Sequence, residues 1–230
     1  MGEPPDFAWE QPSVTMSSRP LMHRTVHYGA IALVGAVLQF IAAMIVAQFG
    51  YPNYSLAQNY ISDLGNTSLS PWYYVFDGSI AVLGVLTAIA ILLVWSSFAP
   101  GSARAIGLLL LLIAGVAAIF VGAFPENVNG TVHAIASLLV FAPSGLGLLI
   151  LGGGAMPART HWTPFRAFTI VLGVVTLVAL VMFLFSLWGP LGPGTVERII
   201  VAPVLLWALV ISTHLLRLPA RAPSRFVSGA

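Results

Sequence analysis

Six long apolar segments dominate this chain and constrain its fold more than any other feature. Each spans about 20 to 26 residues, enough for a helix rising 1.5 Å per residue to cross a hydrocarbon core of ~30 Å. Lipid offers backbone N–H and C=O groups no partners, so such segments must be helical. We therefore predict an all-α, polytopic membrane bundle of six transmembrane helices. They are expected at about residues 25–49, 72–97, 104–123, 131–153, 165–188 and 195–218.

The composition agrees with a membrane protein and excludes several classes of function. Of the 230 residues, 58% are hydrophobic and 7% are charged, whereas soluble domains carry about 25% charged residues. The chain has no Cys, which excludes thiolate metal sites and cysteine nucleophiles. Its basic residues form no stripe of the kind that binds nucleic acid. We expect membrane lipids as partners, no nucleic acid and no cofactor.

Arginine placement predicts the orientation. Eight of the nine basic residues lie on one side of the predicted helices, namely Arg19, Arg24, Arg104, Arg159, Arg166, Arg217, Arg221 and Arg225. The positive-inside rule makes that side cytoplasmic. Residues 1–22 are then a disordered cytoplasmic tail, 23–218 the transmembrane domain and 219–230 a second cytoplasmic tail. Because every basic residue is Arg and none is Lys, which is typical of a GC-rich genome, we expect a multi-pass protein of a bacterial plasma membrane.

Aromatic residues gather at the ends of the predicted helices, where amphipathic rings favour the membrane interface. Those expected at the outer interface are Tyr51, Tyr54, Trp72, Tyr73, Tyr74 and Trp188, and Trp162 is expected at the inner one. The third predicted helix also carries small residues on one face, which indicates close helix packing. These are Gly107, Ala114, Ala118 and Gly122.

Most of the remaining polar residues fall on the outer side, in loops or at the outer ends of helices. Charged groups near lipid are costly and tend to face a bundle interior or a watery cavity. We therefore predict a shared outer pocket that binds a lipid headgroup or a small polar ligand. Its candidate residues are Asn59, Ser62, Asp63, Asp77, Glu126, His133, Ser137, Glu197 and Arg198.

Arg198 is the only basic residue on the outer side. We expect it to pair with a carboxylate, most simply Asp63 or Asp77, and a structural ion pair is the favoured interpretation. Glu197 near the start of a helix also has a simple explanation, because the helix dipole favours a negative charge there.

His133 begins the fourth predicted helix, with Ser137 one turn further along the same face. Either His133 acts as an acid, base or ligand, or it bonds the adjacent loop. A hydrolase could be written from Ser62 or Ser137 with His133 and Asp63, but no nucleophile elbow supports it. The carboxylates and His133 are admissible metal ligands. No short-range metal motif is present, however, so no metal is assigned.

Three motifs resemble a known family. Tyr60-Ile61-Ser62-Asp63-Leu64-Gly65 resembles the signature after the first helix of the Frag/DRAM/Sfk superfamily of six-helix membrane proteins. Gly122-Ala123-Phe124-Pro125-Glu126 with His133 resembles its second signature. Thr195-Val196-Glu197-Arg198-Ile199 resembles the last-helix signature of the prokaryotic branch, domain-of-unknown-function family 998.

The resemblance covers about residues 24–218. It implies a six-helix fold and, through eukaryotic relatives tied to lipid remodelling, lipid asymmetry and autophagy, a connection to lipids. It implies no catalytic residues.

Two functional alternatives remain beside a ligand-binding pocket. One is a membrane-embedded lipid hydrolase or transferase that uses His133 as general base, with the carboxylates orienting it or holding a metal. The other is a small transporter, which requires a polar path to the cytoplasmic side. A purely structural role is also compatible with the sequence.

Overall fold

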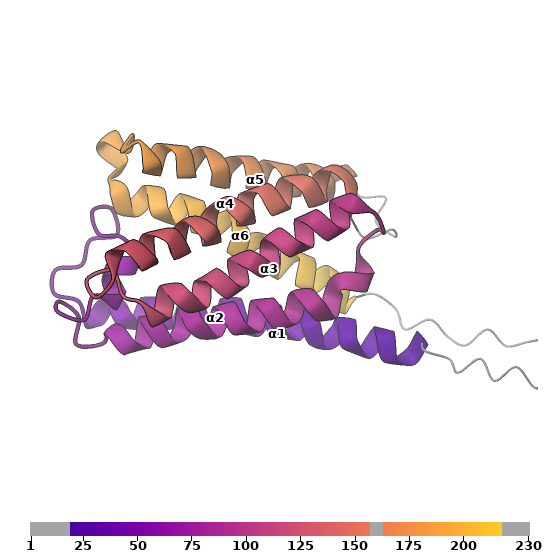
Figure 1. The fold of residues 1–230 in the computed structure, drawn as a ribbon, viewed down its shortest axis with the longest axis horizontal. Coiled ribbons are helices and arrows are strands. Elements are labelled where there is room, and N and C mark those ends of the chain that lie inside the picture. Colours follow the sequence, from indigo (N-terminus) through magenta and orange to yellow (C-terminus); the bar gives the residue numbers. More distant parts are fainter. Residues whose placement is uncertain (1–18, 157–162, 218–230) are drawn as a thin grey trace, which may run out of the picture.

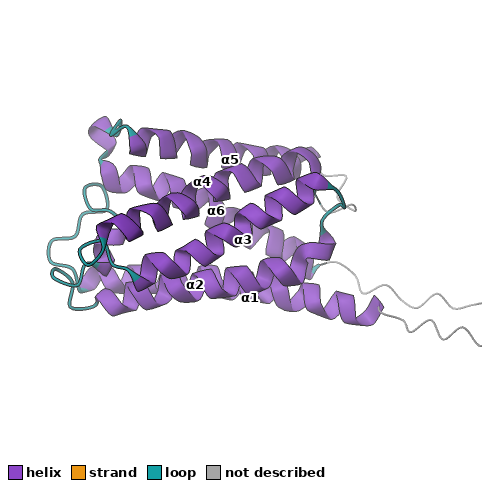
Figure 2. Cartoon of the chain, viewed as in Figure 1, coloured by secondary structure: helices purple, strands orange, loops and turns teal. Residues whose placement is uncertain are grey.

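The six predicted segments form six long helices joined by short connections (Figure 1). This computed structural model describes residues 19–156 and 163–217. The long helices are α1 (Arg19–Phe49), α2 (Tyr73–Val94), α3 (Ser102–Ala123), α4 (Gly130–Gly154), α5 (Thr163–Leu184) and α6 (Pro193–Leu216). Short 3-10 helices lie in the connections, namely η1 (Ser62–Gly65), η2 (Trp95–Ser97) and η3 (Gly189–Leu191). The described residues contain no strand (Figure 2), so the predicted all-α fold is confirmed.

All six long helices of the described residues are long and apolar enough to cross a membrane. The chain is therefore a multi-pass membrane protein. Helix ends differ from the prediction by a few residues. The first helix begins at Arg19 rather than at residue 25, and α5 ends at Leu184 rather than at residue 188. Ser186 has a φ of 55°, a left-handed conformation that does not continue a helix. Of the tail expected at 1–22, residues 19–22 belong to α1, and residues 1–18 lie outside the described residues. The tail expected at 219–230, which includes Arg221 and Arg225, also lies outside them, as do Arg159 and Trp162.

Each helix packs against the next one along the chain, and α6 returns to pack against α1. The fifth helix packs mainly against α4 and α6, and lies along one edge of the view in Figure 1. The other five helices surround a space on the bundle axis, to which α5 contributes no lining residue. The bundle is thus a ring of five helices with α5 on its outside.

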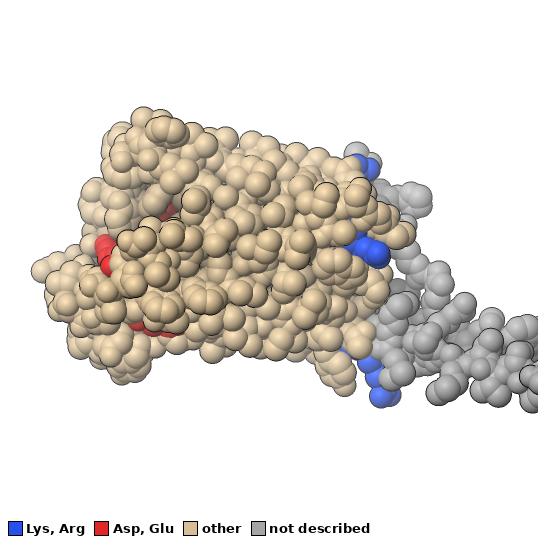
Figure 3. Space-filling view, viewed as in Figure 1, with Lys and Arg blue, Asp and Glu red and all other residues tan. Residues whose placement is uncertain are grey.

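The charged side chains separate to opposite ends of the bundle (Figure 3). We call the end of the bundle that carries Asp63, Asp77, Glu126 and Glu197 the acidic end. We call the opposite end, which carries Arg24, Arg104, Arg166 and Arg217, the arginine end. Arg198 is the only described cation at the acidic end. The two ends correspond to the two sides of the membrane on which the sequence places these residues. The assignment of the arginine end to the cytoplasm stays a prediction.

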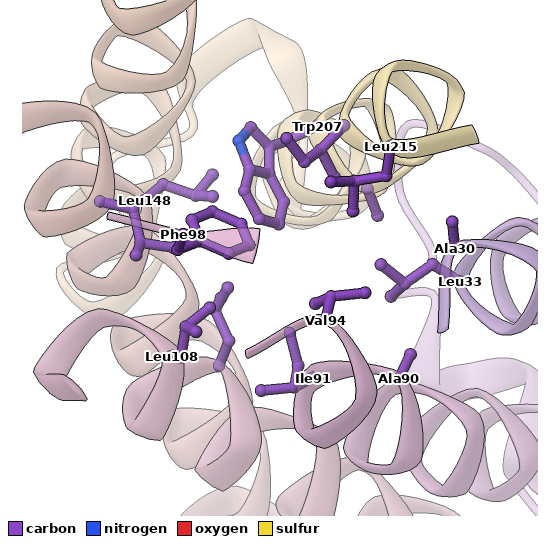
Figure 4. Close-up of a cluster of buried hydrophobic side chains, with 14 of the residues drawn as sticks. Ala30, Leu33, Ala90, Ile91, Val94, Phe98, Leu108, Leu148, Trp207 and Leu215 are labelled. Atoms are coloured by element: carbon purple, nitrogen blue, oxygen red, sulfur yellow. The ribbon is translucent and has the colours of Figure 1, made fainter. Parts of the chain in front are cut away.

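A dense hydrophobic core fills the bundle near the arginine end (Figure 4). Trp207 of α6 points into it, among side chains that include Val94, Phe98 and Leu148. Its indole N–H donates to the hydroxyl of Thr169 at 3.2 Å, so the buried polar atom of the ring is satisfied. This core closes the arginine end of the bundle.

Glycines allow the helix backbones to approach closely. A methyl group added to Gly84 of α2 would collide with the carbonyl oxygen of Gly115 of α3, and one on Gly147 of α4 would lie 3.0 Å from the carbonyl oxygen of Gly107. Small residues at such contacts are the usual way in which transmembrane helices pack. The small face predicted on the third helix therefore serves two neighbours, since Gly107 faces α4 and Gly122 faces α2.

We predict that Gly84→Val destabilises the bundle, because the added side chain meets backbone that cannot move aside. Overpacking of this kind costs about 1–3 kcal/mol. Gly78→Val is the matched control, since Gly78 lies in the same helix with nothing within 4 Å of an added methyl group. Thermal unfolding of the purified proteins in detergent measures the difference. Equal melting temperatures for the two variants would contradict the packing described.

Candidate functional site

The loop between α1 and α2, residues 50–72, folds back onto the start of α6. The backbone N–H groups of Gly194 and Thr195 donate to the carbonyl oxygen of Ala57 at 2.9 and 3.3 Å. The first N–H groups of a helix have no partner within the helix, so these donors are available to the loop. A methyl group on Gly194 would overlap the carbonyl oxygen of Asn59. Glycine is therefore required at this position for the loop to reach the helix.

Arg198 fastens the same loop through its guanidinium group. Its Nη1 donates to three carbonyl oxygens, those of Leu56 at 2.8 Å, Asn59 at 3.1 Å and Gly194 at 2.8 Å. Its Nη2 donates to the hydroxyl oxygen of Tyr54, and the guanidinium lies 5.6 Å from the centre of the Tyr54 ring. Arg198 thus binds backbone and an aromatic ring rather than an acidic side chain.

The expected ion pair between Asp63 and Arg198 is wrong. Within the described residues, no hydrogen bond or ion pair joins the two side chains, nor does one join Arg198 to Asp77. Asp63 accepts hydrogen bonds instead from the backbone N–H of Tyr60 at 2.8 Å and from the side-chain amide of Asn59 at 3.1 Å. The carboxylate therefore stabilises the turn of its own loop, while the arginine binds carbonyl groups that only the folded loop presents.

Tyr54 is a part of this arrangement that sequence reasoning placed only in an interfacial aromatic belt. Its hydroxyl donates to the carbonyl oxygen of Tyr60 at 2.8 Å while accepting from Arg198. Burial raises the pKa of Tyr54 to about 12, against the opposing effect of the Arg198 guanidinium. The hydroxyl therefore keeps its proton and holds the two halves of the loop together. Nothing in the order of residues signals this role.

Glu197 lies beside Arg198 in the chain but is buried, with 5% of its surface exposed. Its Oε2 accepts a hydrogen bond from the backbone N–H of Ile61. The side chain of Ile61 is itself buried. Glu197 therefore binds a backbone N–H group of the loop, whereas Arg198 binds carbonyl oxygens of the loop.

A second set of contacts joins the α1–α2 loop to the loop between α3 and α4. The hydroxyl of Ser62 donates to Glu126 at 3.2 Å. The side-chain amide of Asn127 donates to the hydroxyls of Thr67 at 2.8 Å and Ser68 at 3.1 Å, and accepts from the Thr67 backbone at 3.1 Å. Asn127 was not a candidate from the sequence, and an amide in a loop gives no distinguishing signal.

Asp63 lies next to Glu126, and this proximity affects the charge of Glu126. Burial, and after it the neighbouring Asp63 carboxylate, raises the pKa of Glu126 to about 7. Hydrogen bonds from Ser62 and Asn66 act in the opposite direction. Glu126 therefore exchanges its proton near neutral pH.

Two of the candidate residues stand apart from these contacts. Nδ1 of His133 lies 3.0 Å from the carbonyl oxygen of Phe124, so this nitrogen carries the proton and donates. This is the structural role considered for His133, a bond to the adjacent loop. Asp77 is buried on α2 with its Oδ1 against Gly65, and its carboxyl makes no hydrogen bond to any described residue. No group of three or more His, Asp or Glu suited to a metal ion occurs in the part of the chain that the structure describes.

Two adjoining cavities lie beneath the α1–α2 loop, on the bundle axis. The first, of about 60 Å³, is lined by apolar side chains and by Ser62, Ser137 and Glu197. The second, of about 90 Å³, is lined almost entirely by apolar and glycine residues and ends near Trp207. Both share the same lining at their junction: Leu83, Ala118, Val140, Phe141 and Val201. The axis of the bundle is therefore hollow, and the one charged group among its described lining residues, Glu197, lies at the acidic end.

These residues divide the nine candidates into three groups. Six join the loops to α6 and to each other, namely Asn59, Ser62, Asp63, Glu126, Glu197 and Arg198. Ser137 lines the first cavity together with Ser62 and Glu197. Asp77 and His133 line neither cavity.

Comparison with known proteins bears on the same residues. A family model described as protein of unknown function (DUF998) matches residues 33–214, well over half of the chain. The chain belongs to the DUF998 family. The DUF998 match takes in the whole region from Asn59 to Arg198, and it confirms the family indicated by the three motifs. The wider superfamily resemblance stays a prediction. The comparison with curated proteins and the comparison with solved structures each found no match.

We predict that Arg198→Lys loosens the α1–α2 loop of this DUF998 protein even though the charge is kept. A lysine ammonium cannot span three carbonyl oxygens and a tyrosine hydroxyl as the planar guanidinium does. Several hydrogen bonds to a charged donor are lost, each worth about 1.5–3 kcal/mol. Chymotrypsin should cleave the variant faster after Tyr54 and Tyr60, as followed by mass spectrometry. Arg217→Lys at the arginine end is the control, and equal cleavage of both variants would refute the clamp.

We also predict a pH dependence of stability that originates at Glu126. The carboxyl ionises near pH 4.5 when unfolded and near pH 7 when folded. Between these values the folded state binds more protons, so stability falls as the pH rises through this window. Because Glu126 is partly exposed and screened, we expect a loss of only about 1 kcal/mol.

Glu126→Gln should flatten this dependence, because the amide does not titrate and can still accept from Ser62. Thermal unfolding of wild type and variant in detergent at about pH 5 and about pH 8 makes the comparison. A difference between the two proteins that is the same at both pH values would argue against Glu126 as the titrating group.

Proposed function

We propose that this DUF998 protein binds an amphipathic lipid in the hollow of its bundle. The headgroup lies at the acidic end, beside Ser62, Ser137 and Glu197. The part of the apolar chain next to it fills the two cavities, which are too small for a whole chain. The observation that carries this proposal is the change from apolar to polar lining along the two adjoining cavities. We place the protein in a bacterial plasma membrane with the acidic end outward.

The chemistry of the larger cavity favours an apolar occupant over water. Its polar side chains are Thr87 and Ser144, and the hydroxyl of Ser144 already donates to the carbonyl oxygen of Val140 at 2.6 Å. A water molecule needs two to four polar partners to occupy a buried site. An unfilled apolar cavity forfeits dispersion contacts along its lining. A lipid chain would restore those contacts.

The two alternative functions receive less support. A hydrolase requires a base beside its nucleophile. Nδ1 of His133 donates to Phe124, and the hydroxyl of Ser62 donates to Glu126. A transporter requires a polar path along the axis. The buried hydroxyls of Thr169 and Ser212, towards the arginine end, donate to carbonyl oxygens of their own helices.

The proposal predicts that Val140→Trp expels the bound lipid, because Val140 lines both cavities. Leu139→Trp is the matched control, since Leu139 is the preceding residue of α4 and is 44% exposed on the lipid-facing surface. Native mass spectrometry of the purified proteins, with identification of the extracted lipids, should find bound lipid in wild type and control. We expect at least a tenfold loss in Val140→Trp.

Size-exclusion profiles and melting temperatures show whether Val140→Trp remains folded. The same lipid content in all three folded proteins would overturn the proposal, as would a wild-type protein that releases every lipid on mild delipidation and takes none back.

A further inference from the structure

We infer that the bound lipid ends in a head that donates hydrogen bonds and carries no negative charge, such as a hydroxyl group, and not in a carboxylate or a phosphate. This inference rests on the proposed function and names the chemistry of the ligand at that site. It is carried by the hydrogen-bonding capacity and the charge of the three polar side chains at the acidic end of the cavities.

The polar end of the hollow is rich in acceptors. Glu197 is buried and lines the smaller cavity, and only its Oε2 is engaged, by the backbone of Ile61. Its other carboxyl oxygen has no partner among the described residues. Ser62 donates its proton to Glu126, so that its oxygen is left to accept. A ligand group that donates a hydrogen bond would therefore satisfy these acceptors.

Ser137 completes the set. Its hydroxyl lines the smaller cavity and makes no hydrogen bond to any described residue. It can donate to the oxygen of a ligand or accept from it. A hydroxyl head would thus donate to Glu197 and accept from Ser137, which satisfies both of its functions.

The charge of the site excludes an anionic head. Among the described residues, Glu197 is the only ionisable side chain that lines either cavity. Arg198 lines neither cavity, and its guanidinium is engaged by three carbonyl oxygens and Tyr54. A phosphate or carboxylate would lie beside a buried carboxyl group, in a site of low dielectric constant where like charges repel strongly. Arg198 is the one described cation nearby, and the carboxyl groups of Asp63, Glu126 and Glu197 outnumber it. Even a protonated Glu197 supplies one donor and no positive charge.

The residues around the smaller cavity also disfavour an anionic head. Asp63 and Glu126 lie above the smaller cavity on the two joined loops, where Ser62, a lining residue, bonds Glu126. Negative potential at the entrance lowers the local concentration of anionic ligands.

The experiment compares amphiphiles that share one chain and differ only in the head. Hexadecanol, hexadecylamine, hexadecanoate and hexadecyl phosphate are titrated against the delipidated full-length protein in detergent, and native mass spectrometry counts the bound molecules. We expect hexadecanol to bind at least tenfold more tightly than hexadecanoate or hexadecyl phosphate. Hexadecylamine, which also donates hydrogen bonds and carries no negative charge, should likewise bind more tightly than the two anions, and weaker binding than either anion would contradict the inference. Equal or tighter binding of the anions would overturn the exclusion of a negative charge.

Glu197→Gln tests the residue itself. The amide oxygen can still accept from Ile61, so the fold is preserved, whereas the negative charge is removed. The preference for hexadecanol over hexadecyl phosphate should shrink by tenfold or more. Asp77→Asn is the matched control, because it removes a buried carboxyl at the same end that lines neither cavity, and it should leave the preference within about twofold of wild type. An unchanged preference in Glu197→Gln would contradict the inference.

Ser137→Ala provides a second test that does not depend on Glu197. Because this hydroxyl holds no described part of the structure together, its removal should leave the melting temperature unchanged. Loss of one hydrogen bond should weaken hexadecanol binding by about two- to tenfold. Unchanged binding would show that the head lies elsewhere.

The failure of this inference is distinguishable from failure of the proposed function. If no hexadecyl compound binds, or if Val140→Trp binds them as wild type does, the cavity is not a lipid site and both fall. If Val140→Trp abolishes binding but the anionic compounds bind best, lipid binding stands and only the chemistry of the head is wrong.

Discussion

Hydrocarbon gives the peptide backbone no hydrogen-bond partner, and the architecture of this protein follows from that constraint. The six helices satisfy this constraint because their backbone N–H and C=O groups bond to each other within each helix. The α1–α2 loop cannot, because most of its residues are not helical and it lies against the end of the bundle. Its carbonyl groups are met instead by the first N–H groups of α6 and by Arg198. Two sets of groups that would each be unsatisfied, the loop carbonyls and the start of a helix, thus satisfy one another.

Adjacent residues of opposite charge fasten the loop from both sides. Arg198 supplies donors for its carbonyl oxygens, and Glu197 supplies an acceptor for the N–H of Ile61. Backbone dipoles therefore solvate both charges, and neither needs an oppositely charged side chain. The four carboxyl groups of the acidic end outnumber its one described cation, Arg198, which makes that end electronegative. The Tyr60–Gly65 motif and the Thr195–Ile199 motif are the two halves of one contact.

The fold could be predicted from the sequence because its signal is additive over many residues. A run of about 20 apolar residues predicts a spanning helix whatever the order of the side chains, and arginines at the helix ends separate the two sides of the membrane. The contacts at the acidic end are different in kind. Arg198 could be recognised as an isolated cation, but its partners are carbonyl oxygens, which every residue has. Asp63 was expected to bind Arg198 because opposite charges attract, whereas backbone geometry places Tyr60 N–H and Asn59 within its reach instead.

The cavities on the bundle axis could not be predicted from the sequence either, because they arise where side chains leave space unfilled. Small residues such as Gly84 and Gly115 bring α2 and α3 into backbone contact. The same residues line the larger cavity and leave its space open. At the arginine end, by contrast, Trp207 and large aliphatic side chains occupy the axis (Figure 4).

The bundle is therefore closed and apolar at one end, hollow in the middle, and polar and negative at the other. This gradient runs along the helices, in the same direction in which a lipid in the leaflet at the acidic end orders its own chain and head. A molecule that is apolar along its length and donates hydrogen bonds at its tip matches the apolar lining of the hollow and also the acceptors at its polar end. An anionic lipid of the same length matches only the apolar lining.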